Sequence, residues 1–229
     1  MNNEREYPWG QNQKLENIDR SKLPEIISQG GYQVILIAGP NGVGKGTIIQ
    51  GLLERNEGVA QVNRTTTKLI TSEENQYHQV TIESFFESID NGRLVEWGKY
   101  GQGYYGTRIR DIAQSLGKGK KLVIDIDIEG GIVLRSFFEN LGVQVFDCFI
   151  SPVPEHKLQN KDGISEAVEI LRSRLITRNR DEGEVELAGR LRNAEQMLKS
   201  AKSFRHVIVN EQDNLNSALL QLESLIAKN

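Results

Sequence analysis

The chain has 229 residues, with 28 lysines and arginines against 31 aspartates and glutamates, a formal net charge of −3 and 38% apolar residues. This length suits one α/β domain with a full core and small inserted subdomains, and the composition excludes a disordered chain. The slight negative balance argues against broad electrostatic binding of nucleic acid, and we expect no nucleic-acid partner.

The cysteine content and the hydropathy of the sequence favour a cytoplasmic location for the protein. Cys148 is the single cysteine, so no intrachain disulfide can form, and its apolar neighbours predict a buried, inert thiol. No apolar run approaches the roughly 20 residues that span a bilayer, and the first residues lack the basic and apolar regions of a secretory signal. The three histidines lie far apart and give no metal-ligand spacing. We therefore expect a cytoplasmic protein without a membrane partner.

The first half of the chain predicts an extension followed by a domain. Residues 1–31 are polar apart from a short helix near 22–29, and we treat them as an N-terminal extension to a domain at 32–229. The run YQVILIAG (32–39) predicts a buried parallel strand, and KGTIIQGLLER (45–55) a helix directly after a loop. Short mixed strands and one helix follow, at 59–67, 81–92 and 93–101.

The second half returns to regular α/β alternation. A helix, a strand, a helix and a strand are predicted at 109–119, 121–130, 131–142 and 143–151. After a surface loop come a helix, a charged segment, a helix, a strand and a last helix, at 164–178, 179–186, 187–202, 206–210 and 214–227. The pattern predicts an α/β fold with a parallel central sheet flanked by helices.

The stretch GPNGVGKGT has the form of a phosphate-binding loop. It matches G-x-x-x-x-G-K between a strand and a helix, except that Gly46 stands where Ser or Thr usually helps to hold magnesium. Lys45 supplies charge to the β- and γ-phosphates, and Thr47 is the nearest replacement hydroxyl for magnesium. A glycine-rich structural turn is the alternative. The expected nucleotide contacts are Gly39, Pro40, Asn41, Gly42, Val43, Gly44, Lys45, Gly46 and Thr47.

Two carboxylates follow in DIDIEGG. Period-2 alternation places Asp125 and Asp127 on one face of a predicted strand, at its carboxyl end. Buried carboxylates are costly unless they meet solvent, a cation or donors. We expect both to contact magnesium, with Asp125 also positioning the acceptor, and a capping or edge-strand pair is the alternative.

Arginines cluster in the region of the long helix and the charged segment. Arg174 and Arg178 are four residues apart on one helix face, and Arg190 follows after the segment. Solvated helix charges are the simpler explanation. The functional explanation is a mobile lid whose guanidinium groups close over a transferring phosphoryl group.

Taken together, GPNGVGKGT, RLVEWGKYGQGYYGT, VIDIDIEGG and RLITRNR…GRLRNAEQML closely resemble guanylate kinase, in the family's order and nearly its spacing. The resemblance runs from about Gln33 to the C-terminus. It implies a P-loop kinase fold with an inserted acceptor-binding subdomain at about 61–107 and a helical lid at about 176–190. It also implies transfer of the γ-phosphoryl group of ATP, with Mg²⁺, to GMP or dGMP by a monomer or homodimer.

Matching positions in that family imply roles for individual residues. Glu96, Tyr105 and Thr107 would contact guanine or its phosphate, and Asn63 stands where a serine is usual. Glu73 would accept the N–H donors of guanine, and Tyr77 would offer a hydroxyl to the phosphate. The lid arginines fall on Arg178 and Arg190, expected to be catalytic with Lys45. Asn210 matches the segment near the adenine of ATP.

The acceptor loop departs from the family pattern V-S-x-T-T-R-x-x-R-x-G-E, since this chain has VNRTTTKLITSE. Thr67 and Ile70 replace two arginines that bind the acceptor phosphate. Arg64 and Lys68 are the nearby cations that could compensate. A one-residue shift would instead align Lys68 with the first arginine and Glu74 with the glutamate.

Two other functions remain open on this sequence. The altered loop fits a kinase of the same fold that phosphorylates another small phosphorylated acceptor. A non-catalytic guanylate-kinase-like binding module is the other possibility, but the intact phosphate loop and lid arginines favour an enzyme.

Overall fold

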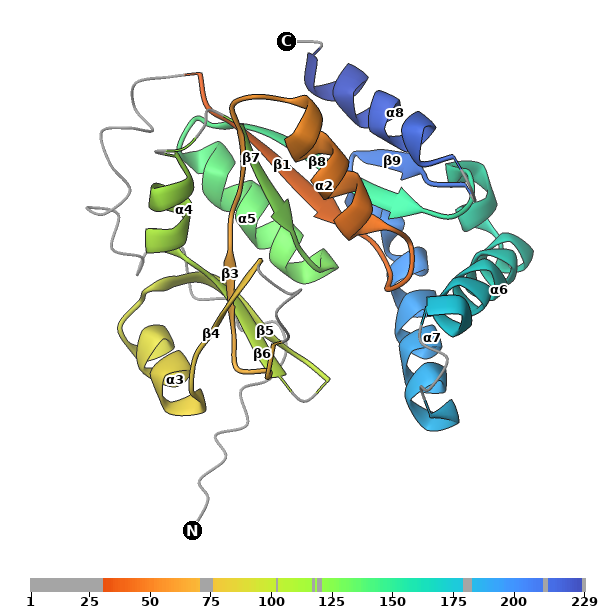
Figure 1. Cartoon of the computed structure of the whole chain (residues 1–229), viewed down its shortest axis with the longest axis horizontal. Coiled ribbons are helices and arrows are strands. Elements are labelled where there is room, and N and C mark those ends of the chain that lie inside the picture. The colour runs from red at the N-terminus through yellow and green to blue at the C-terminus, as the bar shows by residue number, and fades with distance from the viewer. Residues whose placement is uncertain are drawn as a thin grey trace.

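The computed structural model describes residues 31–70, 76–101, 103–116, 118, 121–178, 183–211 and 214–227; of Arg178 it describes the backbone alone. Three predicted features lie outside these residues, namely the short helix near 22–29 and the carboxylates Glu73 and Glu74. The described residues form an α/β fold with a parallel central sheet, so the predicted fold class is confirmed (Figure 1).

The central sheet has five strands in the order β2-β7-β1-β8-β9, and every pairing is parallel. β1 is apolar and buried from Val34 to Ala38, because helices cover both of its faces. The strands are β1 (Gln33–Ala38), β2 (Val59–Gln61), β7 (Lys121–Asp125), β8 (Gln144–Ser151) and β9 (His206–Val209).

Helices α2 (Lys45–Arg55) and α5 (Ile128–Asn140) cover this sheet. The connection β1–α2–β2 runs toward one edge and β7–α5–β8 toward the other, so right-handed crossovers place the two helices on opposite faces. The last helix, α8 (Leu215–Ala227), packs beside α2. Because every pairing in this sheet is parallel, the carboxyl ends of all five strands lie at one edge, the place where open α/β sheets bind ligands.

A second, mixed sheet follows α2 and lies below the parallel sheet in Figure 1. Its order is β4-β3-β6-β5, and α3 (Ile82–Asp90) packs on it through a small apolar cluster that includes Phe85 and Trp97. α4 (Ile109–Leu116) then leads back to the parallel sheet. The strands are β3 (Arg64–Thr66), β4 (Tyr77–Gln79), β5 (Leu94–Tyr100) and β6 (Gly103–Arg108).

The predicted lid region is a pair of packed helices, α6 (Lys161–Arg178) and α7 (Glu184–Lys199), preceded by the 3₁₀ helix η3 (Glu155–Gln159) and followed by η4 (Ala201–Ser203). α6 begins at Lys161 rather than at 164. Asn160 explains the earlier start, because its side-chain oxygen accepts the N–H of Gly163 at 2.9 Å.

The strand predicted at 121–130 is shorter than expected. β7 ends at Asp125, and Asp127 is the N-cap of α5, its side chain accepting the N–H of Gly130 at 2.8 Å. The prediction that both aspartates share one face of a strand is therefore wrong. The alternation of Asp and Ile resembles a strand, but the capping geometry of Asp127 starts a helix there.

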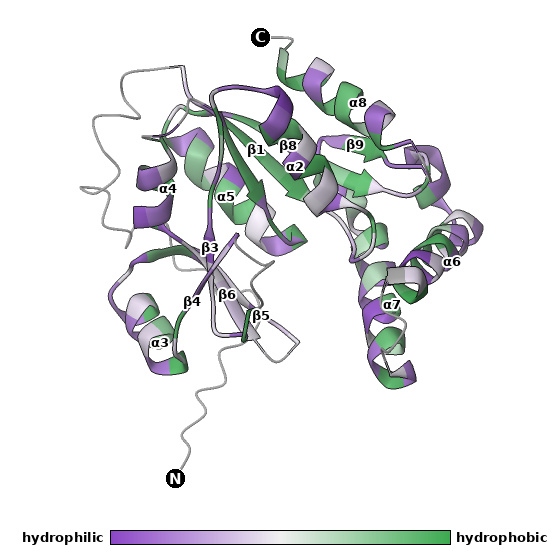
Figure 2. Ribbon diagram, in the orientation of Figure 1, coloured by the Kyte–Doolittle hydropathy of each residue, from purple (hydrophilic) through white to green (hydrophobic). Residues whose placement is uncertain are grey.

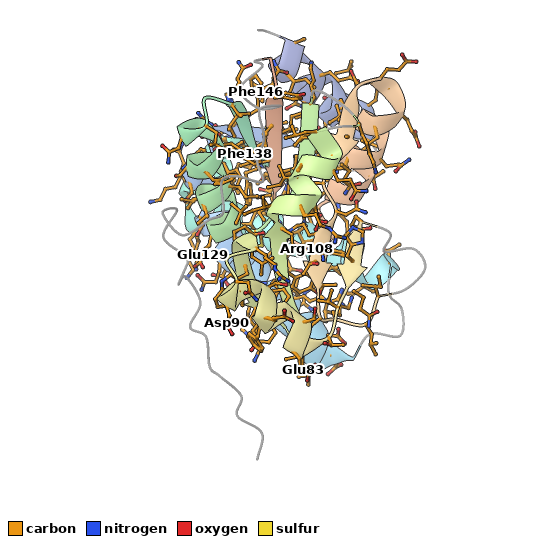
Figure 3. All side chains as sticks on the ribbon, turned by 90° about the vertical axis from the view of Figure 1, so that its left-hand side faces the viewer. Glu83, Asp90, Arg108, Glu129, Phe138 and Phe146 are labelled. Atoms are coloured by element: carbon orange, nitrogen blue, oxygen red, sulfur yellow. The ribbon has the colours of Figure 1, made fainter. Side chains whose placement is uncertain are left out.

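The hydropathy of the residues differs between the buried central sheet and the outlying helices. Figure 2 shows hydrophobic colour concentrated on β1, β8 and β9 and mixed colour on α6 and α7. In Figure 3, Phe138 and Phe146 lie with the parallel sheet, whereas Glu83 and Asp90 lie on α3 at the other end of the molecule. Among the described helices, none is both long enough and apolar enough to cross a bilayer.

Candidate active site

The phosphate-binding loop lies between β1 and α2, as predicted. α2 begins at Lys45 with Gly44 as its N-cap, and no side chain in the described ranges caps its first N–H groups. These groups are therefore available to an anion at the helix N-terminus. Lys45 Nζ donates to the carbonyl oxygens of Gly39 at 2.7 Å and Pro40 at 3.4 Å. The Lys45 ammonium group is thus held at the loop itself.

Asn210, at the end of β9, braces this loop from behind. Its side-chain amide donates to the carbonyl of Val43 at 2.7 Å, and its own N–H donates to Ser151 at 2.8 Å. Gly44 has φ +95°, and a Cβ there would lie 2.4 Å from Asn210 Nδ2. Asn210 thus braces the loop conformation. Its predicted contact with ATP stays a prediction.

The two aspartates meet the loop at the carboxyl edge of the sheet. Asp125, Asp127 and Lys45 line one cavity together with Arg64 of the second sheet. Burial raises the pKa of Asp125 above its usual range, although the charges of Lys45 and Arg64 act in the opposite direction. Of the two aspartates expected at the carboxyl end of the strand, Asp125 belongs to β7 and Asp127 to the N-cap of α5.

The residues at this edge fit a hard divalent cation. Mg²⁺ takes oxygen ligands and usually keeps several waters beside one or two carboxylates and substrate phosphates. Asp125 offers its carboxylate, and Asp127 retains one oxygen beyond the one that caps α5. Thr47 lies exposed in the first turn of α2, beside Gly46.

On the second-sheet side of the cavity, Arg64 lines the wall and Glu96 is buried in contact with it. Arg64 Nη2 contacts the two carboxylate oxygens of Glu96 at 3.0 and 3.2 Å, and Thr107 donates its hydroxyl to Glu96 Oε1 at 2.5 Å. Arg64 Nε donates to Thr107 Oγ1 at 3.3 Å, and Nη1 to the carbonyl of Asp125 at 3.4 Å. The arginine therefore joins the second sheet to the parallel sheet.

This pair is held almost without solvent. Glu96 is 1% exposed and Arg64 6% exposed. Desolvation raises the pKa of Glu96, opposed by the Arg64 charge and the Thr107 hydroxyl. Desolvation lowers the pKa of Arg64, but the negative charges of Glu96 and Asp127 outweigh it and raise the pKa above its usual value. The guanidinium is therefore charged across the working pH range.

Two tyrosines complete the acceptor side. Parallel pairing of β3 with β4 sets Arg64 opposite Tyr77, and antiparallel pairing of β3 with β6 sets Thr66 opposite Tyr105. The two tyrosine rings meet edge to face, with centroids 5.6 Å apart, and both residues line the cavity. The sequence identifies both tyrosines only through the family resemblance.

Tyr100 is a cavity residue that the sequence analysis missed. It alternates with Glu96 and Gly98 along β5, a period-2 signal that places the three on one face. Its hydroxyl accepts from Asn41 at 3.0 Å and also hydrogen-bonds Asn193 of α7. Burial raises the pKa of Tyr100. One side chain thus connects the phosphate loop, the second sheet and helix α7.

The remaining predicted residues lie at different distances from the cavity. Arg190 forms a 3.0 Å ion pair with Glu186 on the same face of α7, and its charge acts on Tyr100. Lys68 is exposed beyond the end of β3, and Asn63 is half-buried just before that strand. Arg174 points elsewhere, donating to the carbonyl of Asn210 at 2.9 Å, which anchors α6 to β9.

Comparison with known proteins agrees with this geometry. A family profile described as guanylate kinase matches residues 31–229. The chain is 32% identical over 208 residues to a guanylate kinase of Synechocystis sp., covering 90% of this chain and 98% of that protein. It is 31% identical over 183 residues to a guanylate kinase of Campylobacter jejuni, covering 78% and 81% respectively.

A solved structure supports the same fold. The guanylate kinase from Anaplasma phagocytophilum superposes with a TM-score of 0.59 over 86% of this chain and 85% of that one, at 20% identity. The fold, the cavity between phosphate loop and second sheet, and the match along residues 31–229 agree with one another. The chain therefore belongs to the guanylate kinase family.

Proposed function

We propose that this chain transfers the γ-phosphoryl group of ATP to GMP, giving ADP and GDP. The observation that carries the proposal is a single cavity lined from both sides. Lys45 and Asp125 lie on the phosphate-loop side, and Arg64, Tyr77 and Tyr105 on the second-sheet side. A donor nucleotide on the loop and an acceptor on the sheet would bring their phosphates together over Lys45.

Catalysis would consist of positioning and charge neutralisation, without a covalent intermediate. Lys45 would hold the β- and γ-phosphates, with the N–H groups of the α2 N-terminus beside it. Arg178 and Arg190 are proposed to reach the transferring group from the lid helices. Tyr100 supports this arrangement, since it already ties α7 to Asn41 of the loop.

Magnesium would be held with the ATP phosphates by Asp125 and Asp127, with Thr47 as the nearest hydroxyl. When bound, it neutralises charge on the β- and γ-phosphate oxygens. The charge of Lys45 also acts on Asp125, so the loop lysine and this carboxylate partly offset each other's charge in the cavity.

On the acceptor side, Tyr77 and Tyr105 are proposed to donate their hydroxyls to the phosphate of GMP. Asn63 and Lys68 flank β3 and would contribute at the same side, and Glu73 is proposed as a guanine contact on the family resemblance alone. Glu96 and Thr107 would act through Arg64, which they hold by hydrogen bonds in the cavity wall.

One observation favours a second candidate, a kinase of this fold with another phosphorylated acceptor. Thr67 stands in place of an arginine, and its Oγ1 accepts the N–H of Tyr104 at 3.0 Å, a contact within the sheet. Ile70 offers no charge at all. The two positions therefore supply none of the arginine forks that usually hold a phosphate monoester.

A coupled assay of ADP release with GMP, dGMP, AMP, CMP and UMP tests the proposal. We expect GMP to give the highest kcat/KM, with dGMP next. Lys45→Ala should abolish turnover while the melting temperature stays within a few degrees, since Lys45 contacts only loop carbonyls among the described residues. A different preferred acceptor would establish the second candidate, and undiminished turnover in Lys45→Ala would refute both.

A further inference from the structure

A guanidinium, not a carboxylate, faces the acceptor side of the cavity. Arg64 lines the cavity wall, whereas Glu96 is 1% exposed and contacts Arg64 through both carboxylate oxygens. Glu96 Oε1 is further occupied by the Thr107 hydroxyl. A ligand that enters from the cavity therefore meets the N–H groups of Arg64 before the oxygens of Glu96.

Arg64 keeps donor capacity toward that ligand. An arginine carries five N–H donors in a rigid plane. Its contacts with described residues are Nε to Thr107, Nη1 to the Asp125 carbonyl, and Nη2 to the two oxygens of Glu96. These contacts use at most four donors, so at least one N–H of Arg64 has no acceptor in the described part of the chain.

The charges around Arg64 disfavour an anion at this donor. Glu96 neutralises the guanidinium, and Asp127 adds a second negative charge that also acts on it. A phosphate dianion at the same point would meet more carboxylates than cations. A neutral acceptor, such as a ring carbonyl, takes the N–H without that repulsion.

We propose that Arg64 determines base specificity by donating an N–H to O6 of a 6-oxopurine, while Glu96 and Thr107 hold its guanidinium in position. This inference rests on the proposed function, in which GMP is the acceptor. Guanine presents O6 and N7 as acceptors on one edge, an edge that arginine commonly contacts. Adenine presents an N6–H₂ donor there, so AMP would set a donor against a donor.

The test compares two acceptors in four proteins. GMP carries O6, and 2-aminopurine riboside 5′-monophosphate keeps the 2-amino group and N7 but lacks O6 and, with it, the N1–H of guanine. Wild type is compared with Arg64→Met, Arg64→Lys and Arg64→Met/Glu96→Gln. The double variant replaces the buried ion pair by neutral groups of similar size, so it folds even if an unpaired Glu96 destabilises Arg64→Met.

The measured quantity is the ratio of kcat/KM for GMP to that for the 2-aminopurine nucleotide. We expect this ratio to fall about 10- to 100-fold in Arg64→Met and in the double variant, the loss typical of one charge-assisted hydrogen bond. It should fall less in Arg64→Lys, and KM for ATP should stay constant. The control Arg135→Met/Asp147→Asn removes another arginine–carboxylate pair, outside the cavity lining, and should leave the ratio unchanged.

Three results would overturn the inference. An unchanged ratio in the double variant would assign O6 recognition to another group. An equal loss for both acceptors would make Arg64 a contact to the phosphate or sugar. A lower KM for GMP in Arg64→Met would make Arg64 an obstruction of the base site.

Failure of the proposed function is separable from failure of this inference. If wild type does not phosphorylate GMP, equilibrium binding of the same two nucleotides is measured by calorimetry. A preference for GMP that Arg64→Met removes would support the role of Arg64 without the reaction. Equal binding of the two nucleotides by wild type would refute that role as well.

Discussion

Gly44 shows at the scale of one residue why the phosphate loop requires glycine. Its φ of +95° is a left-handed conformation that side chains disfavour, and Asn210 Nδ2 occupies the space where a Cβ would stand. The side-chain amide of Asn210 can therefore brace the loop only because residue 44 has no side chain.

Gly44→Ala should lower stability by roughly 1–2 kcal/mol from the left-handed backbone alone, and further by displacing Asn210 from the loop. Thermal or urea unfolding measures the loss, and ATP binding should weaken with it. Gly46→Ala is the matched control, because its added Cβ would have no described atom within 4 Å apart from its chain neighbours and its own helix backbone, and its φ is ordinary. Equal stabilities of the two variants would show that Asn210 does not constrain the loop.

Thr67 and Ile70 stand where the family pattern has two arginines. Thr67→Arg with Ile70→Arg should lower the KM for GMP about tenfold or more, since each guanidinium contact to phosphate is worth roughly 1.5–3 kcal/mol. Part of that gain is offset by loss of the Thr67 contact to the Tyr104 N–H. Steady-state kinetics with GMP varied at saturating ATP measures the KM for GMP in the variant and in wild type.

Ile70→Gln, which is polar but uncharged, serves as the control for the arginine variant and should leave KM unchanged. If the double arginine variant leaves KM where it was, the acceptor phosphate lies away from this loop, and the register drawn from the family pattern is wrong.

At the scale of elements, Asp147 of β8 ties three segments together outside the cavity lining. Its carboxylate, 1% exposed on β8, accepts from Arg135 of α5 at 2.6 Å and from the backbone N–H of Arg205 at 3.1 Å, and it also contacts the Arg205 guanidinium. Burial alone raises the pKa of Asp147, but the hydrogen bonds from Arg205 and Arg135 lower it below its usual value.

Asp147→Asn should cost about 2 kcal/mol of unfolding free energy at pH 7, through loss of charge-assisted hydrogen bonds. The folded-state pKa is depressed, so the unfolded chain binds the proton first. The stabilisation is therefore complete above a pH of about 4 and is lost as the pH falls below it. Urea unfolding at pH 7, 5 and 3 should show the difference from wild type shrinking at pH 3.

Glu57→Gln, at an exposed turn, is the control and should match wild type throughout. A difference between Asp147→Asn and wild type that stays constant down to pH 3 would mean that the charge of Asp147 contributes nothing and that only its shape matters.

At the scale of the whole molecule, Tyr100 connects the three parts that must act together. Tyr100 lies on β5 of the second sheet, and its hydroxyl hydrogen-bonds Asn41 of the phosphate loop and Asn193 of α7. In the proposed reaction, closure around two nucleotides would bring these three parts into one arrangement.

Tyr100→Phe should lower kcat about five- to thirtyfold, the equivalent of one or two hydrogen bonds, while the melting temperature changes little. Tyr104→Phe is the control, because that ring packs on Phe85 and Phe86 beneath α3. Kinetics and thermal unfolding of both variants separate the two effects. A loss of kcat in Tyr104→Phe equal to that in Tyr100→Phe would remove the special role of the Tyr100 hydroxyl.

Local patterns in the sequence determined much of this molecule. Helix α2 begins at Lys45 and ends at Arg55, as its pattern predicts, and β1 follows the apolar run that precedes the loop. These elements depend on neighbouring residues: glycines permit the loop, and helical spacing gives α2 a buried face. The α/β alternation, and with it the edge that carries Lys45 and Asp125, follows from the same local signals.

The tertiary structure alone decided which side chains meet in the cavity. Arg64 and Glu96 are 32 residues apart, and Thr107 is 43 from Arg64; they come together because β6 pairs with both β3 and β5. Asp127 caps a helix although its alternation with isoleucine resembles a strand, because the Gly130 N–H lies within reach. Side-chain partners in a sheet depend on strand order and register, which involve residues far apart in the chain and leave no local periodic signal.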